Sequence, residues 1–190
     1  MNTECNRISY ALVSAINGEA WHGDSLRKIL DNITAEQAEG TNMHTTHSIW
    51  ELVLHVEAWV KFCLGAVQGT PIPTWRAMPK ERDWPPVVET GEQAWKQAVN
   101  SFFSSHLELV EALKTWNDDR LEATVPGRRY NFHRLFQGMT LHALYHRSQV
   151  VQLTQMLLLA VEFAEFFRPE ALSKSPEFQS CAFLSCAIFC

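Results

Sequence analysis

The sequence lacks any apolar run long enough to cross a bilayer. Its longest runs, MLLLAV at 156–161 and CAFLSCAIFC at 181–190, fall well short of the ~20 residues that a membrane helix needs. The first residues also lack a charged segment followed by a clean apolar core, which is the pattern of a secretory signal peptide. We therefore expect a cytoplasmic protein with no membrane partner.

Basic residues and cysteines are also scarce, and both shortages exclude a class of protein. The 190 residues include 16 Lys and Arg against 21 Asp and Glu, and the net charge is −5. A basic patch or stripe is typical of nucleic-acid-binding proteins, whereas this chain offers only a short GRR at 127–129, so we expect no nucleic-acid partner. The five cysteines are an odd number and three of them lie in the last ten residues, which argues against a disulfide framework.

Strand-like alternation is nearly absent, and helical periodicity takes its place. Apolar residues recur with helical spacing over five stretches: roughly 4–16, 24–33, 48–69, 89–115 and 132–158. Asp24 is the predicted N-cap of the second stretch. The third opens with Ser48 and Glu51, a capping box, and closes at Gly69. Five of the eight prolines fall within 70–88, so this segment is predicted to be a long crossover.

Four long amphipathic helices and one long crossover predict an all-α four-helix bundle, with the crossover between its second and third helices. An open helical array would need internal repeats of about 30–50 residues, and the sequence has none. We place the bundle at 1–157 and a C-terminal extension of unknown role at 158–190. A fifth helix, a dimerisation element and a disordered appendage all stay open for that extension.

The stretch LHALYHRSQV at 141–150 puts polar residues on the predicted inner face of the last helix. His142 and His146 are four residues apart, so their rings lie one above the other and can chelate a divalent metal. Gln149 follows on the same stripe. The best third ligand is His55, at the edge of the buried stripe of the helix 48–69. Three imidazoles leave a fourth coordination position for water or substrate.

Spacing alone leaves a second interpretation open, because a single histidine on an apolar face is more often a hydrogen-bonded core residue. Each polar group buried alone costs about 1–3 kcal/mol, which favours a shared metal for a cluster of three. No catalytic residue is assigned; Gln149 and Glu51 are candidates to support the ligands, although a capping role is favoured for Glu51. Six residues in or beside predicted loops are further candidates to line a pocket: His22, His44, His47, Trp21, Trp75 and Trp84.

The chain resembles the DinB-like (YfiT-like) superfamily of metal-dependent enzymes over about residues 5–157. Four segments carry the resemblance, in order: 18–30, 47–59, DWPPV at 83–87 with the Trp-containing helix after it, and 125–153. The resemblance implies an up-down-down-up bundle, a homodimer, and one divalent metal, most often nickel or zinc, held by His55, His142 and His146. Ser148 stands where the family commonly has Gly, and we expect little effect from it.

The resemblance and the spacing together predict a metal-dependent enzyme, a transferase or hydrolase. The metal would activate a low-molecular-weight thiol cosubstrate or water, for transfer to or hydrolysis of a small electrophilic molecule. The alternative is a non-enzymatic, metal-stabilised binding or stress-response protein. The two hypotheses share the metal site and differ in whether it turns over a substrate.

Overall fold

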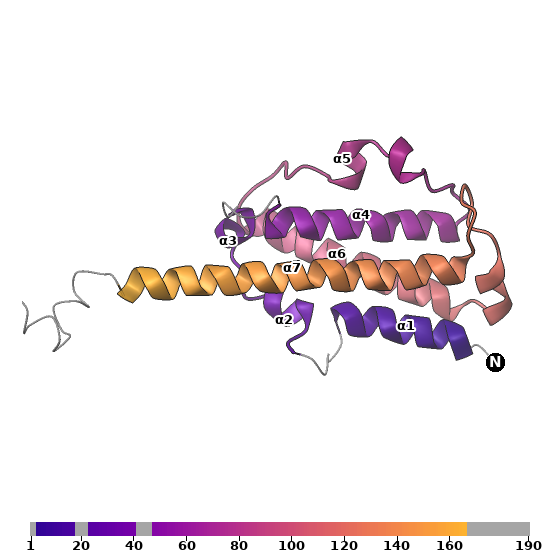
Figure 1. Ribbon diagram of the computed structural model, residues 1–190, viewed down its shortest axis with the longest axis horizontal. Helices are drawn as coiled ribbons and strands as arrows, with labels where there is room; N and C mark the ends of the chain where they lie inside the picture. The colour runs from indigo at the N-terminus through magenta and orange to yellow at the C-terminus, as the bar shows by residue number, and fades with distance from the viewer. Residues whose placement is uncertain (1–2, 18–22, 41–46, 167–190) are drawn as a thin grey trace, which may run out of the picture. The chain divides into compact units, whose positions relative to one another are not determined.

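All regular secondary structure that the computed structural model describes is helical (Figure 1). The structure describes residues 3–17, 23–40 and 47–166. Within those ranges no strand occurs, and an isolated β-bridge pairs Thr124 with Asn131. The all-α prediction is confirmed.

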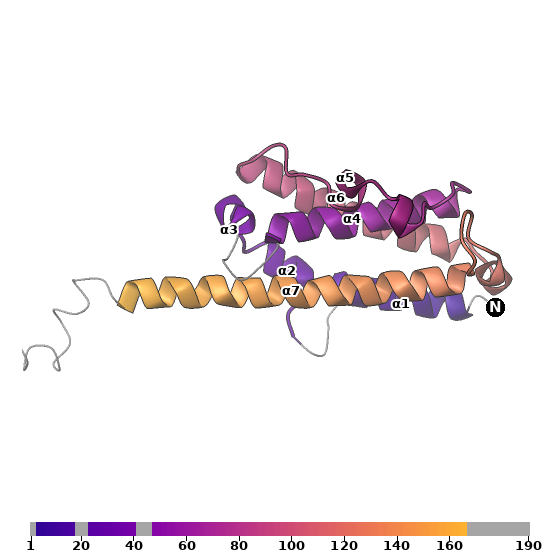
Figure 2. The ribbon, with the colours of Figure 1, turned by 45° about the horizontal axis from the view of Figure 1, so that its top comes forward.

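Four long helices lie side by side in both views (Figures 1 and 2). They are α1 (Thr3–Ile16), α4 (Ile49–Val67), α6 (Glu92–Lys114) and the first part of α7 (Phe132–Phe166). Helix α6 packs against both α1 and α4. Large apolar side chains fill the space between these helices, and each one fully buried contributes about 1.5–3 kcal/mol; they include Trp95, Phe102, Phe103, Phe136 and Leu109. This core holds the faces of α4 and α7 in place.

The buried face of α6 includes a histidine among its apolar residues. His106 is 6% exposed, whereas the neighbouring Leu107 is 45% exposed. Adjacent helical residues are about 100° apart, so the two side chains point in different directions. The His106 Nδ1 donates to the Phe102 carbonyl oxygen at 2.7 Å, which lets the imidazole take the inner position.

Helix starts follow local capping rules, with one correction and one omission. The predicted capping box of α4 is present, since Ser48 and Glu51 exchange backbone-to-side-chain hydrogen bonds. The N-cap of α2 (Leu26–Leu30) is Ser25 and not Asp24, because the Asp24 carboxylate pairs with the Lys28 ammonium at 2.8 Å. The short α3 (Ala35–Glu39), which opens with its own capping box, lies between two of the predicted stretches and was not predicted.

The crossover between α4 and α6 is not wholly irregular. It contains the 3₁₀ turn η1 (Trp75–Ala77) and the short α5 (Lys80–Asp83), and a second 3₁₀ turn, η2 (Asp118–Glu122), follows α6. A residue that precedes proline is disfavoured in the helical conformation, so α5 ends before Trp84-Pro85. Helix α5 packs on α4, which brings Asp83 and Trp84 against the middle of that helix.

Helix α7 continues to Phe166, beyond the predicted end near 158. The chain divides into two compact units between Val151 and Gln152, and the site described below lies wholly in the first. No helix in the described ranges combines the length and apolarity needed to cross a membrane. Residues 167–190 of the predicted C-terminal extension lie outside the described residues.

Candidate metal centre

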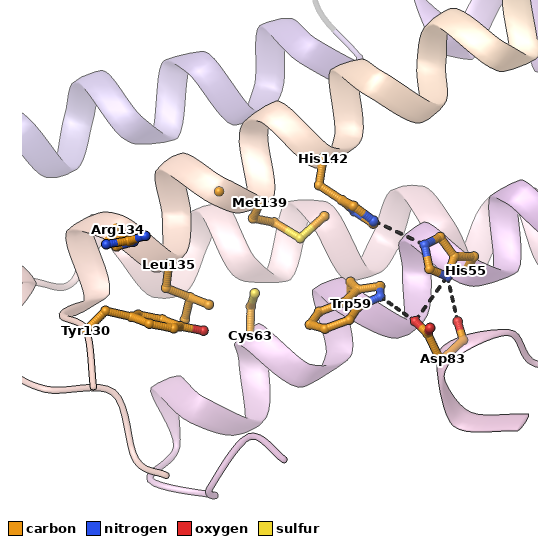
Figure 3. A pocket seen from close by; sticks show the side chains of 10 residues that line it. His55, Trp59, Cys63, Asp83, Tyr130, Arg134, Leu135, Met139 and His142 are labelled. Atoms are coloured by element: carbon orange, nitrogen blue, oxygen red, sulfur yellow. Dashed lines mark hydrogen bonds and ion pairs between the residues drawn. The ribbon is translucent and has the colours of Figure 1, made fainter. Parts of the chain in front are cut away.

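The three predicted histidines come together between α4 and α7. The Nε2 atom of His142 lies 3.1 Å from the Nε2 of His55 and 3.1 Å from the Nε2 of His146. One ligand nitrogen from each ring lies within 4.8 Å of the other two. His142 and His146 come from successive turns of α7, as their spacing predicted, and His55 comes from the middle of α4. Figure 3 shows the rings of His55 and His142 facing each other.

These separations suit a shared metal ion. Zinc binds histidine nitrogen at about 2.0–2.1 Å in tetrahedral geometry, which places ligand nitrogens about 3.3–3.4 Å apart. The observed contacts of 3.1 Å and the upper bound of 4.8 Å bracket that distance. Small rotations of the rings therefore suffice to form three coordination bonds.

Two of the rings are held by hydrogen bonds on the side away from the cluster. The His55 Nδ1 donates to the Asp83 backbone carbonyl at 2.6 Å, and the His146 Nδ1 donates to the Gln149 side-chain oxygen at 2.7 Å. Because a carbonyl oxygen only accepts, the proton of each neutral ring lies on Nδ1 and the Nε2 lone pair is free. Partners of this kind fix the tautomer and direction of metal-binding histidines.

Burial keeps the three rings neutral. It lowers the pKa of His55 and of His146 below the ordinary histidine value. Burial, with the neighbouring His146 and His55, lowers the pKa of His142 to about 3. A neutral imidazole is the form that binds a metal, so the cluster presents ligand lone pairs at pH 7.

Of the three rings, His142 is the one whose nitrogen atoms are not fully satisfied by hydrogen bonds. Its Nδ1 is buried without a hydrogen-bond partner among the described residues. Its Nε2 faces the lone pairs of both His55 and His146, and a single N–H cannot fully satisfy two acceptors. A cation at this point would satisfy all three Nε2 atoms together, so the donor set fits a metal ion.

The crossover clamps the ring of His55. The Trp84 indole is stacked between two imidazoles, with ring centroids 3.6 Å from His47 and 3.8 Å from His55 and planes within 9° of parallel. The Trp59 indole N–H donates to the Asp83 carboxylate at 2.8 Å, and that carboxylate lies 3.4 Å from the His55 Nδ1. Both the backbone and the side chain of Asp83 thus face His55. Asp83 was not predicted to be part of the site, because nothing in the local pattern of the crossover indicates which helix the crossover covers.

A cavity of about 400 Å³ opens beside the cluster. His55 and His142 lie at one end, and Arg134 and Tyr130 lie at the other (Figure 3). Cys63 lines the cavity between them, and burial raises the pKa of its thiol to about 12. Its thiol is therefore not ionised at neutral pH and is a poor nucleophile.

Of the other residues singled out in the sequence, those that the structure describes are not ligands of the cluster. The Glu51 carboxylate serves the capping box and lies 3.4 Å from the His47 Nδ1, and none of its described contacts is with His55. Gln149, a candidate to support the ligands, accepts a hydrogen bond from His146 with its side-chain oxygen. Ser148 is exposed and its hydroxyl donates to the Tyr145 carbonyl at 2.6 Å. His22, His44, Trp21 and the side chain of Trp75 lie outside the described residues.

Helices packed side by side and three clustered imidazoles define an all-α protein with a possible three-histidine metal site. A family model, described as the DinB superfamily, matches residues 20–150, which is well over half of the chain. The chain belongs to the DinB superfamily. No curated protein matches it. The matched range contains His55, His142, His146 and Gln149.

Proposed function

We propose that this protein is a metal-dependent enzyme in which His55, His142 and His146 hold one divalent ion, nickel or zinc. When bound, such an ion lowers the pKa of a coordinated thiol or water and so supplies the nucleophile. The proposed reaction is attack of that nucleophile on a small electrophilic molecule, as a thiol transfer or a hydrolysis. The supporting observation is that three Nε2 lone pairs converge at one end of a cavity.

The chain's own residues position and enclose the reacting groups. The Asp83 carbonyl and the Gln149 oxygen hold two of the rings with Nε2 facing inward, and Trp84 covers one face of His55. The walls of the cavity are mainly apolar, which limits the entry of water. The buried thiol of Cys63 stays protonated, so this thiol is not the nucleophile, and the proposal takes the thiol from a cosubstrate.

The proposal also covers the setting of the enzyme. We propose a cytoplasmic homodimer that uses a low-molecular-weight thiol, with its four long helices in the up-down-down-up order of a four-helix bundle. The long crossover between α4 and α6 supports this order, since a short loop would force those two helices to be antiparallel neighbours.

The test is a metal titration of the purified chain and of two histidine variants. After chelation and dialysis, Ni²⁺ and Zn²⁺ are titrated by calorimetry, and bound metal is counted by elemental analysis. We expect one ion per chain in the wild type and none in His146→Ala. The control is His133→Ala, which removes a part-exposed histidine of α7 that contacts Glu4, and we expect it to bind metal normally. Stoichiometric metal in His146→Ala would refute the assignment.

Activity is measured separately. The metal-loaded chain is incubated with a low-molecular-weight thiol and a small aryl halide, and loss of the thiol is followed. A parallel series with small ester and amide substrates tests hydrolysis. We expect one of these reactions to require the metal and to be lost in His146→Ala.

A second candidate function is a binding or stress-response protein in which the metal serves stability alone. The crowded Nε2 atoms of the three rings favour it, because a metal would satisfy all three whether or not a reaction follows. A metal-induced rise in melting temperature without turnover in any of the series above supports this candidate over the enzyme.

A further inference from the structure

The far end of the cavity carries an exposed arginine that no acidic residue of the described ranges neutralises. Arg134 lines the cavity at the end opposite His55 and His142 (Figure 3). Its guanidinium forms no ion pair with a carboxylate of the described residues. The guanidinium carbon lies 6.0 Å from the centroid of the Tyr130 ring. Arg128 approaches the same ring at 5.9 Å, but it also donates to the Pro73 carbonyl. Arg134 is therefore the guanidinium available to a ligand.

The space between the two ends is apolar. Its walls include Trp59, Leu135 and Met139, and Figure 3 shows the side chains of Leu135 and Met139 between Arg134 and the histidines. A volume of about 400 Å³ is within the range of about 300–1,000 Å³ that is typical of small-molecule sites. Such walls favour a flat or hydrocarbon body and reject a strongly hydrated one.

We propose that the cavity binds a monocarboxylate with an apolar body, whose carboxylate pairs with Arg134 and whose other end reaches the three histidines. Guanidinium and carboxylate match in a bidentate pair of hydrogen bonds, and one guanidinium balances one negative charge. The assignment of the histidine end as the reacting end rests on the proposed function. The pairing of the carboxylate with Arg134 does not, because it needs no metal.

The experiment compares two probes of nearly equal shape, 3-phenylpropanoate and its uncharged amide, 3-phenylpropanamide. Binding to the full chain is measured by ligand-observed NMR titration, first after chelation of metal and then with Zn²⁺ added. In the metal-free wild type we expect the acid to bind about tenfold tighter than the amide, since a bidentate hydrogen-bonded pair of opposite charges contributes about that factor. We expect Arg134→Gln to remove the preference.

The matched control is Arg129→Gln, which removes an exposed arginine of the loop just before α7 that is not part of the cavity wall. It should keep the tenfold preference. Equal affinities in the wild type, a preference that survives in Arg134→Gln, or no binding of either probe would each overturn the proposal. A preference that occurs only with Zn²⁺ also overturns it, because the carboxylate is then bound by the metal.

The outcome is separable from that of the proposed function. A chain that binds no metal but prefers the acid through Arg134 would refute the metal enzyme and leave the carboxylate site. A chain that binds one metal but shows no preference would do the reverse.

Discussion

Gln149 sets the tautomer of His146, so replacing it tests whether the cluster is oriented for a metal in advance. Its side-chain oxygen accepts from the His146 Nδ1 at 2.7 Å. In Gln149→Leu this acceptor is gone, and the ring is free to carry its proton on Nε2, the atom that faces the cluster. In Gln149→Glu a carboxylate replaces the amide, and a carboxylate partner makes the ring more basic. The two variants should therefore change metal affinity in opposite directions.

The size of the effect follows from the role of such partners. Loss of a hydrogen-bond partner behind a metal-binding histidine typically costs 10–100-fold in affinity, which corresponds to about 1.4–2.7 kcal/mol. For a domain of this size each kcal/mol changes the melting temperature by about 2–4 °C. We expect the rise in melting temperature on adding metal to shrink by about 3–10 °C in Gln149→Leu and to grow in Gln149→Glu.

The assay is a competition titration of Zn²⁺ between the protein and a chelator of known affinity, with thermal melts of the metal-free and metal-loaded forms. Gln137→Leu serves as the control, because Gln137 is exposed on the same helix and touches none of the three rings. An affinity of Gln149→Leu within twofold of the wild type would show that the tautomer is not set by this contact. An equal loss in Gln137→Leu would attribute the effect to α7 in general.

Four further predictions concern the scaffold. Burial lowers the pKa of His106 from 6.5 to about 4, so between these pH values the unfolded state binds more protons than the folded state and stability falls as the pH drops. The free energy of unfolding, measured with urea, should decrease by up to about 3 kcal/mol because of this group. The decrease due to this group should be absent in His106→Leu. Cys63, whose pKa is about 12, should resist iodoacetamide at pH 8 in the native chain and react in urea, as mass spectrometry will show. Gly127 has φ +76° and a Cβ there would meet backbone and side-chain atoms at 3.1 Å, so Gly127→Ala should lower the melting temperature. Gly138→Ala, at an open helical position, should raise stability by about 0.5–1 kcal/mol.

Features set within one or two turns of a helix were predictable from the sequence. The capping box of α4 needs only Ser48 and Glu51, and both partners are three residues apart. The proximity of His142 and His146, on successive turns of α7, follows from the helix repeat alone. The choice of His55 as the third ligand needed only the phase of α4, because an edge position faces the neighbouring helix.

Features that depend on one segment folding onto another were not predictable in the same way. Asp83 and Trp84 lie in a proline-rich crossover with no periodicity, so nothing local indicates that they cover His55, 28 residues before Asp83. Arg134 reads as an ordinary solvated residue near a helix start, and its place at the end of a cavity appears only when α4 and α7 are packed. The burial of His106 beside the exposed Leu107 has another cause: a hydrogen bond from the His106 ring to the Phe102 carbonyl oxygen, one turn before, holds the imidazole in the inner position.

The three rings are held in place in two different ways, which explains why the crossover is part of the site. Helix α7 fixes His142 and His146 relative to each other, because both project from one rigid helix on successive turns. His55 is the one ligand that α4 provides, and no residue of α4 forms a hydrogen bond with its ring; the ring contacts Asp83 and His142. The Asp83 carbonyl fixes its tautomer and the Trp84 indole fixes its plane. Immobilising a free side chain on binding costs about 0.5–1.5 kcal/mol. Because the crossover already immobilises the His55 ring when the chain folds, this cost does not reduce the affinity for a metal.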